Sequence, residues 1–390
     1  MGIADQKTIV FLFLHGIHQL YHSAMVAMEL SILQDEFKVI LISCSEQHTA
    51  ILNNIRFLYP ENRCEIITLP LPFRFRYLNF KKKSYPSPHS TMTKAASYLK
   101  NSDAIISTSH STVKMCKKLK VTKPKIIYQY HGCGDRKYSF DPSLGAFDFM
   151  LLPGKYYLKR LMEEKVTGEQ KTAIIGYPKL DYLVNAKHLK EKLFSNDKLV
   201  ILYSPHWKPE LTSYKLWGKQ IVEHFYKSRK YNLIFAPHVL IKHWRFHYGY
   251  DLNLDKYKCD HIHIDFESLN SVNSSYLHIA DLYMGDVSSL VYEWIAIQPR
   301  PCIFLNAHNI QWLDNDYYRH WNYGPVVKSL SEMEQKIEEA VQNSSYLKIQ
   351  KERIVEYMDI TDEPSSRRAA NAIYNFLIKE FPQACLGVTL

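Results

Sequence analysis

Short runs of apolar residues recur along the whole chain, and stretches with apolar residues at helical spacing stand between several of them. The apolar runs cover residues 8–14, 37–43, 103–107, 125–130, 147–152, 199–203, 231–236, 282–284 and 302–305. Runs of this length are typical of strands in a parallel sheet, because helices cover both faces of such a sheet. The pattern therefore predicts an α/β fold with parallel strands.

The stretch from residue 282 to residue 306 shows this alternation most clearly. Its first strand ends at Gly285 and Asp286, and Ser288 and Ser289 stand where the following helix is expected to begin. Such a crossover places these side chains at the carboxyl end of a parallel strand, where open α/β sheets bind ligands. The helix start adds free N–H groups and a positive dipole end, which favour an anion. Serines also cap helices, so a purely structural role remains an alternative.

The chain length predicts two domains, because 390 residues exceed what one ordinary core accommodates. Residues 8–43 resemble the opening of a Rossmann-like half, although they lack the GxGxxG pattern of a dinucleotide site. Residues 199–203 begin a second such half. We place the boundary near residue 185, so that residues 1–185 form the first domain and residues 186–390 the second. A terminal helix over residues 365–381 is expected to pack back on the first domain.

The charge balance favours an anionic partner. The formal net charge is +10, while 46% hydrophobic residues argue against a disordered chain. Residues 74–83, RFRYLNFKKK, interleave five cations with apolar side chains. This segment predicts a contact with an anionic membrane surface, with a solvated loop as the alternative.

Cysteine use and the early sequence indicate a cytoplasmic protein. The seven cysteines include no CxxC pair, which suggests reduced thiols, and the longest early apolar run is too short to span a membrane. Any membrane contact is therefore expected to be peripheral, on the inner face of the plasma membrane. His243 and His247 have zinc-like spacing without an HExxH glutamate, and residues 259–265 alternate as a strand would. Both are interpreted as structural; no cofactor is predicted, and dependence on a divalent metal is left open.

Two histidines follow apolar runs directly. His131 and Gly132 follow the run over residues 125–130, and His238 follows the run over residues 231–236. A histidine at a strand end, beside a glycine that lets a ligand approach the backbone, is suited to general-base catalysis near neutral pH.

Four segments carry a resemblance to a known family: His131-Gly132, the GYPKLD sequence ending at Asp181, Pro237-His238, and the DVSS sequence with its flanking strands. Together they resemble the bacterial CDP-glycerol glycerophosphotransferases of teichoic-acid synthesis. Cys133-Gly134 stands where the family has Thr-Pro. The SPHWK sequence over residues 204–208 matches the family's Ala-Pro-Thr-x-Arg only in part.

The resemblance implies the GT-B arrangement of two Rossmann-like domains facing across a cleft, with the acceptor and membrane on the side of the first and the CDP-activated donor on the second. An acceptor hydroxyl would attack the β-phosphorus and CMP would leave. His131 would act as base, His238 would stabilise charge on the pyrophosphate, and Asp286 would orient His238 or the polyol. The residues expected to bind the donor are Gly132, Ser204, His206, Lys208, Ser288, Ser289 and, at the ribose, Glu293.

Two other functions remain open at this point. One is a GT-B glycosyltransferase that uses a CMP- or UDP-activated sugar in capsule or lipopolysaccharide synthesis. The other is a non-catalytic α/β protein that binds polyanions. No nucleic-acid-binding motif is present, so nucleic acid is not a predicted partner. The resemblance instead implies a polymeric or lipid-linked acceptor from the cell envelope.

Overall fold

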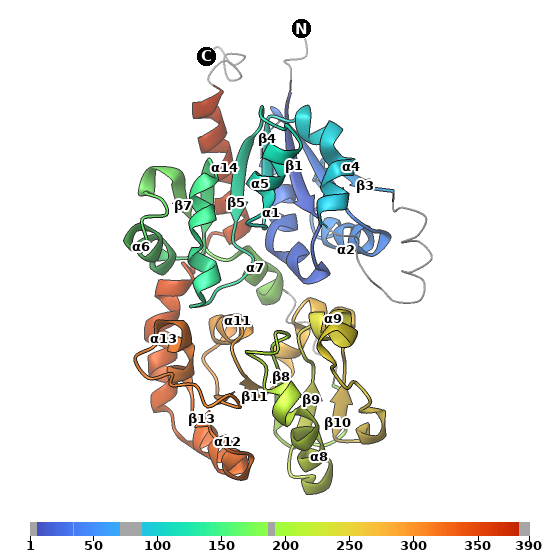
Figure 1. Ribbon diagram of the computed structural model, residues 1–390, viewed down its shortest axis with the longest axis vertical. Coiled ribbons are helices and arrows are strands. Elements are labelled where there is room, and N and C mark those ends of the chain that lie inside the picture. Colours follow the sequence, from blue (N-terminus) through green and yellow to red (C-terminus); the bar gives the residue numbers. More distant parts are fainter. Residues whose placement is uncertain (1–5, 34, 71–87, 186–191, 382–390) are drawn as a thin grey trace. The chain divides into compact units, whose positions relative to one another are not determined.

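The computed structural model describes residues 6–33, 35–70, 88–185 and 192–381. These residues divide into two compact units (Figure 1). The first unit comprises the residues up to His131, Phe140–Asp181 and the residues from Tyr357 onward, and the second comprises Gly132–Ser139 and Tyr182–Glu356. The chain thus leaves the first unit close to the expected boundary. It differs from the expected domains in that residues 132–139 belong to the second unit and residues from 357 onward to the first.

The first unit is built on a parallel sheet, as the apolar runs predict. Within the described residues its strand order is β3-β2-β1-β4-β5-β6-β7, and every neighbouring pair is parallel. The strands are β1 (Lys7–Phe13), β2 (Phe37–Ser43), β3 (Glu65–Thr68), β4 (Ala104–Ser107), β5 (Lys125–Gln129), β6 (Phe149–Leu152) and β7 (Thr172–Ile174). The helices are α1 (Leu20–Leu33), α2 (Glu46–Arg56), α4 (Pro88–Lys100), α5 (Thr112–Lys118), α6 (Lys155–Glu163), α7 (Pro178–Asn185) and α14 (Ser365–Glu380).

The C-terminal helix α14 packs against α1, which confirms the prediction that it returns to the first part of the chain (Figure 1). Helix α1 is buried along almost its whole length. Its Glu29 is 6% exposed, and the Arg367 guanidinium of α14 lies 3.2 Å from the Glu29 carboxylate. This ion pair compensates the charge that α1 carries into the interior, since an unpaired buried carboxylate would be costly.

The second unit has its own parallel sheet, in the order β10-β9-β8-β11-β12-β13 within the described residues. The strands are β8 (Val200–Ser204), β9 (Asn232–Phe235), β10 (Ile262–Ile264), β11 (Leu282–Gly285), β12 (Cys302–Leu305) and β13 (Val326–Val327). The helices are α8 (Lys219–Ser228), α9 (Leu240–Tyr248), α10 (Leu269–Val272), α11 (Leu290–Ile297), α12 (Met333–Gln342) and α13 (Ser345–Tyr357). Strand β8 lies between β9 and β11, so the direction of strand order reverses there, which is where such sheets bind ligands.

One segment differs from its expected form. The strand expected over residues 259–265 is reduced to β10, because Cys259 and Ile262 pair with each other in an antiparallel bridge and the chain turns between them. Residues 312–323 are rich in aromatic side chains and include the 3-10 helix η9 (Asp316–Tyr323), in which Trp321 and Tyr323 are buried. Large aromatic side chains contribute most to burial, which explains their place in the core.

The described helices include none that is both long and apolar enough to cross a bilayer. The basic segment at residues 74–83 lies outside the described residues.

Candidate active site

Asp286 joins two loops at the carboxyl ends of β8 and β11. It follows Gly285, the last residue of β11, and is 1% exposed. Its Oδ1 accepts the backbone N–H of His206 at 2.7 Å, and its Oδ2 accepts both the backbone N–H and, at 2.8 Å, the hydroxyl of Ser213. Both oxygens are therefore engaged by the protein itself. Asp286 fixes the loop after β8 and does not bond to His238, the partner that the sequence suggested.

Burial and hydrogen bonding have opposite effects on the pKa of Asp286. Burial raises the pKa to about 6 from the ordinary value of 3.8, and the hydrogen bonds from Ser213 and His206 oppose that rise. A carboxyl group with this pKa is ionised at neutral pH. The loop after β8 is thus held by a buried negative charge that three donors stabilise.

Two histidines lie together beside this loop. The rings of His206 and His238 are 5.9 Å apart, and Trp207 stacks on His206. Burial lowers the pKa of His206 well below its usual value, with further lowering by Arg136, His238 and Lys208. His206 is consequently uncharged at neutral pH, in the middle of a cationic group of side chains.

His238 is oriented by backbone contacts of its own loop. Its N–H donates to the Pro205 carbonyl at 3.0 Å, and its ring Nδ1 accepts the N–H of Leu240 at 3.2 Å. Because Nδ1 accepts, the proton of the neutral ring is on Nε2. His238 therefore presents an N–H donor, as stabilisation of an anionic oxygen requires.

The two serines before α11 have different roles. The Ser288 hydroxyl accepts the Leu290 N–H at 3.2 Å, whereas Ser289, the residue preceding the helix, makes no capping bond with its side chain. A Cβ placed on Gly132 would lie 3.1 Å from the Ser289 hydroxyl oxygen, so a larger residue at this position would crowd the Ser289 side chain. The Ser289 hydroxyl is thus not used for capping, and Gly132 lies beside it.

Replacing Ser289 with alanine is therefore expected to change stability little. If the hydroxyl binds a donor phosphate, donor affinity should fall by about 1.5–3 kcal/mol, the range for a hydrogen bond to a charged group. Calorimetric titration of donor and melting curves without ligand measure the two effects. Ser45→Ala is the matched control, because the Ser45 hydroxyl accepts the His48 N–H and caps α2; it should cost about 1 kcal/mol of stability and leave donor affinity unchanged. Lowered stability with unchanged donor affinity in Ser289→Ala would show instead that Ser289 caps the helix.

The other expected donor-binding residues occupy the same edge of the sheet or the helix beside it. Ser204 ends β8 and is 6% exposed, and the Lys208 ammonium lies over the Trp207 ring in the next loop. Glu293 is 3% exposed, on the buried side of α11. A ribose contact would need this carboxylate to be accessible, so the geometry favours the loop residues over Glu293.

His131 is the last residue before the chain enters the second unit, and its neighbours in the first unit are basic. The rings of His131 and His22 are 6.4 Å apart, and His22 also contacts Tyr177. Burial lowers the pKa of His22 well below its usual value, with smaller effects of Lys179, His131 and His18. His22 is 3% exposed and His131 is half-buried, so His131 is the more accessible imidazole of the pair.

The GYPKLD segment has a structural explanation. Gly176 has a φ of +79°, and an added Cβ would meet Ser365, Arg368 and the Asp359 carbonyl. The Asp181 carboxylate accepts the N–H groups of Ser365 at 3.0 Å and Ser366 at 2.7 Å, at the start of α14. The segment therefore anchors the C-terminal helix to the first unit.

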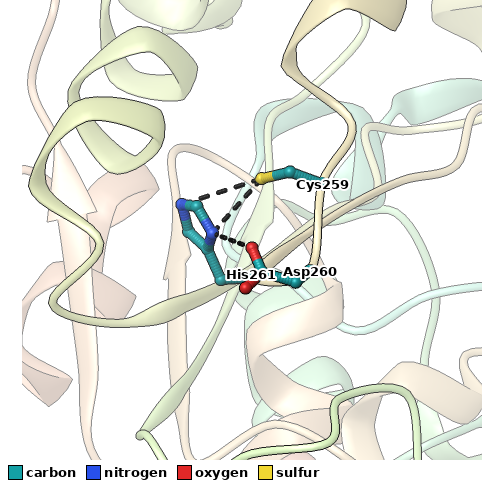
Figure 2. Close-up of side chains that lie close together, drawn as sticks. All are labelled: Cys259, Asp260 and His261. Atoms are coloured by element: carbon teal, nitrogen blue, oxygen red, sulfur yellow. Dashed lines mark hydrogen bonds and ion pairs between the residues drawn. The ribbon is translucent and has the colours of Figure 1, made fainter.

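One group among the described residues has the ligand types of a metal site: Cys259, Asp260 and His261 (Figure 2). His261 Nδ1 lies 2.8 Å from Asp260 Oδ1 and 3.2 Å from Cys259 Sγ. The Arg229 guanidinium contacts both Asp260 oxygens at 3.0 Å. The Asp260 carboxylate already has a cationic partner in Arg229, so an ion-pair network accounts for the cluster.

Three residues of the site were not singled out in the sequence: Asp135, Arg136 and Ser213. The Arg136 guanidinium lies 3.0 Å from His206 Nε2, and Asp135 is buried against Tyr292. The HG turn was a signal for the segment that carries Asp135 and Arg136. Ser213 offered none, since its partner Asp286 is 73 residues away in sequence.

Two units, each built on a parallel sheet with helices, define an α/β protein of the GT-B class. The chain belongs to the CDP-glycerol:poly(glycerophosphate) glycerophosphotransferase family, whose sequence profile matches residues 45–375. That match includes the HG turn, the GYPKLD segment, Pro237-His238 and the DVSS sequence. The family predicted from these four segments is thus confirmed.

Similar proteins point to the same family. A teichoic acid poly(glycerol phosphate) polymerase of Staphylococcus epidermidis is 27% identical over 187 residues, which are 46% of this chain and 25% of that protein. The chain thus spans about a quarter of that relative's length. Among solved structures, the wall teichoic acid polymerase TagF has a TM-score of 0.62 at 17% identity, covering 98% of this chain and 91% of TagF. A UDP-GlcNAc 2-epimerase from Neisseria meningitidis has a TM-score of 0.52 at 14% identity, with 96% and 100% covered. These structures share the fold.

Proposed function

We propose that this protein transfers glycerol phosphate, or a related polyol phosphate, from a CDP-activated donor to a hydroxyl group of a teichoic-acid-type acceptor. The observation that carries the proposal is the site at the ends of β8, β9 and β11. There Asp286 holds the loop that bears His206 and Lys208, beside His238 and the Ser289 hydroxyl. Hydrogen-bond donors and cationic side chains of this kind suit a diphosphate.

The reaction proceeds by attack of the acceptor oxygen on the β-phosphorus of the donor. A new P–O bond forms, the bond between the β-phosphorus and the bridging oxygen breaks, and that oxygen leaves with CMP. His131 accepts the proton of the attacking hydroxyl, and the Nε2–H of His238 donates to an oxygen that gains charge. Lys208, Ser288 and Ser289 bind phosphate oxygens, while Ser204 and Gly132 let the donor approach the strand ends.

Ligand-induced stabilisation tests the donor assignment. Purified protein is melted with CDP-glycerol, CDP-ribitol, UDP-sugars and CMP-sugars in parallel, since a ligand at 100 times its Kd adds about 2.7 kcal/mol. Stabilisation by CDP-polyols, followed by release of CMP in the presence of a glycerol-phosphate oligomer, is the expected result. Stabilisation only by a UDP- or CMP-sugar would assign a glycosyltransferase instead. No stabilisation by any donor would favour a polyanion-binding protein.

We infer a cytoplasmic location, with peripheral binding to the inner face of the plasma membrane, where a lipid-linked acceptor would be available. The support is the net charge of +10 and the cationic, aromatic residues 74–83. Each lysine or arginine near an anionic surface contributes about 1 kcal/mol.

Sedimentation with anionic vesicles is accordingly expected to remove the protein from solution at low salt and release it at high salt, because the attraction is screened. Replacing Lys81, Lys82 and Lys83 with glutamine should weaken the binding. Neutral vesicles are the control. Absence of binding at low salt, or binding unchanged by the triple substitution, would leave residues 74–83 as a solvated loop.

A further inference from the structure

The sheet of the first unit has a switch point of its own, because β2 and β3 lie on one side of β1 and β4 to β7 on the other. Ligands of open α/β sheets bind at the carboxyl ends of the strands beside such a point. Three polar residues of the first unit come together at this edge: His22 in the first turn of α1, and Gln129 and His131 at the end of β5. The proposed function uses only His131 of the three.

Gln129 is buried, and only one end of its side-chain amide is bonded. The amide nitrogen donates to the backbone carbonyl of His22. A carbonyl group only accepts, so the end that meets it is the nitrogen and the other end is Oε1. Among the residues that the structure describes, this oxygen has no hydrogen-bond partner, although Gln129 is 1% exposed. Oε1 is therefore an enclosed acceptor that requires a donor.

His22 has an unpaired ring atom in the same place. Its Nδ1 is buried and makes no hydrogen bond within the described part of the chain. Burial, with the charge of Lys179 as the next cause, holds the pKa of His22 well below its usual value, so the ring is neutral. A neutral imidazole carries one N–H and one accepting nitrogen, so Nδ1 can complete a hydrogen bond in either sense.

The two unpaired atoms restrict the ligand that fits this site. A buried polar atom without a partner destabilises a protein, and such atoms are few in folded proteins. A phosphate oxygen only accepts, so it cannot serve Oε1 of Gln129. An ammonium group would add a positive charge beside that of Lys179. A hydroxyl group both donates and accepts without a charge, and is the group that suits both atoms.

We propose that His22 and Gln129 bind a hydroxyl group of the terminal polyol unit of the acceptor, next to the hydroxyl that attacks the donor. The proposal rests on the proposed function, in which His131 takes the proton of the attacking hydroxyl. The rings of His131 and His22 are 6.4 Å apart, close enough for neighbouring hydroxyls of one glycerol unit to meet one ring each. His131 is half-buried, so the acceptor reaches the two enclosed side chains from its side. The first unit then selects acceptors that carry neighbouring hydroxyls.

The test compares two acceptors that differ in one oxygen atom: a glycerol-phosphate oligomer that ends in glycerol, and the same oligomer ending in a propanediol unit without the middle hydroxyl. Release of CMP from CDP-glycerol measures the rates. The wild-type protein should prefer the glycerol-ended acceptor about 10- to 100-fold in kcat/KM, because the other acceptor leaves buried polar atoms unpaired. His22→Phe and Gln129→Met should each reduce this preference several-fold, by lowering kcat/KM for the glycerol-ended acceptor.

Melting curves without ligand separate binding from folding. His22→Phe keeps a ring of similar size and removes an unpaired polar atom from a buried position, so the melting temperature should be unchanged or higher. His48→Phe is the matched control in the first unit. His48 is also buried, but its ring lies 2.7 Å from the Ser45 hydroxyl and 2.6 Å from the His15 carbonyl. This control should lower the melting temperature and leave the acceptor preference unchanged.

Equal kcat/KM for the two acceptors in the wild type, or a preference that persists in both His22→Phe and Gln129→Met, would overturn the proposal and assign the two atoms to an internal water molecule. Failure of the wild type to release CMP with either acceptor would instead remove the proposed function. Calorimetric titration with the two acceptors in the absence of donor would then still report on His22 and Gln129. The two failures are therefore distinguishable.

Discussion

Replacing His131 with alanine is expected to lower kcat at least ~10²-fold, while the affinity for CDP-glycerol stays close to that of the wild type. The reason is that a general base acts on the acceptor hydroxyl in the transition state, whereas the donor-binding groups are on other residues. His238→Ala should lower kcat by a similar factor, since it removes the Nε2–H donor set by the Leu240 contact. Release of CMP from CDP-glycerol, with a glycerol-phosphate oligomer as acceptor, measures the rates.

His247→Ala provides the control for both histidine variants. His247 is exposed on α9, a few residues after His238. Its removal should leave both turnover and melting temperature unchanged. Turnover near the wild-type rate in a folded His131→Ala or His238→Ala protein would exclude that residue from the mechanism.

Asp286→Asn is expected to reduce both stability and donor binding. The amide nitrogen that replaces one carboxylate oxygen cannot accept a hydrogen bond, so a buried donor of His206 or Ser213 loses its acceptor. Such a loss costs about 1–3 kcal/mol. The loop that carries His206 and Lys208 is then no longer held in place, and donor affinity should fall about 10-fold or more. Asp260→Asn is the control, because it breaks an exposed ion pair with Arg229 and should leave both stability and donor affinity nearly unchanged.

The pH dependence of stability provides a second measurement on Asp286. Its folded-state pKa of about 6 lies above the ordinary value of 3.8, so the folded protein binds more protons than the unfolded chain between these values. The contribution of Asp286 to stability is therefore fully present below pH ~4 and is lost as the pH rises through ~6, a change on the order of 3 kcal/mol. Asp286→Asn lacks this pH-dependent contribution, because an asparagine side chain does not titrate. The difference in unfolding free energy between wild type and variant should decrease from pH 4 to pH 7; a constant difference would contradict the raised pKa.

The sequence was most informative where one local pattern determines the structure. Residues 282–306 form β11, α11 and β12 as predicted, because strand, serine-rich turn, apolar helix and proline turn agree with one another. The positions of His131 and His238 at strand ends followed from the same local patterns. In contrast, the alternation over residues 259–265 was misleading, since a turn with its own antiparallel bridge interrupts it.

Local sequence patterns do not predict contacts between residues that are distant in sequence. Asp286 was expected to orient His238 or the donor, but its oxygens bond to His206 and Ser213, which lie 80 and 73 positions earlier. Asp135 meets Tyr292 and His320 at separations of 157 and 185 residues. No local signal distinguishes an aspartate that binds a ligand from one that is enclosed by backbone N–H groups, because both occur at the ends of strands.

Residues 132–139 belong to the second unit, and the residues from Tyr357 onward belong to the first. Neither unit is therefore formed by one continuous stretch of the chain. A fragment that begins near residue 182 would contain the second sheet but not Asp135, and Tyr292 and His320 would lose the buried carboxylate they share. A fragment that ends near residue 181 would lack α14, which packs on α1. An exchange of one unit between relatives must therefore preserve two sets of contacts: those of Asp135 with Tyr292 and His320, and those of α14 with α1.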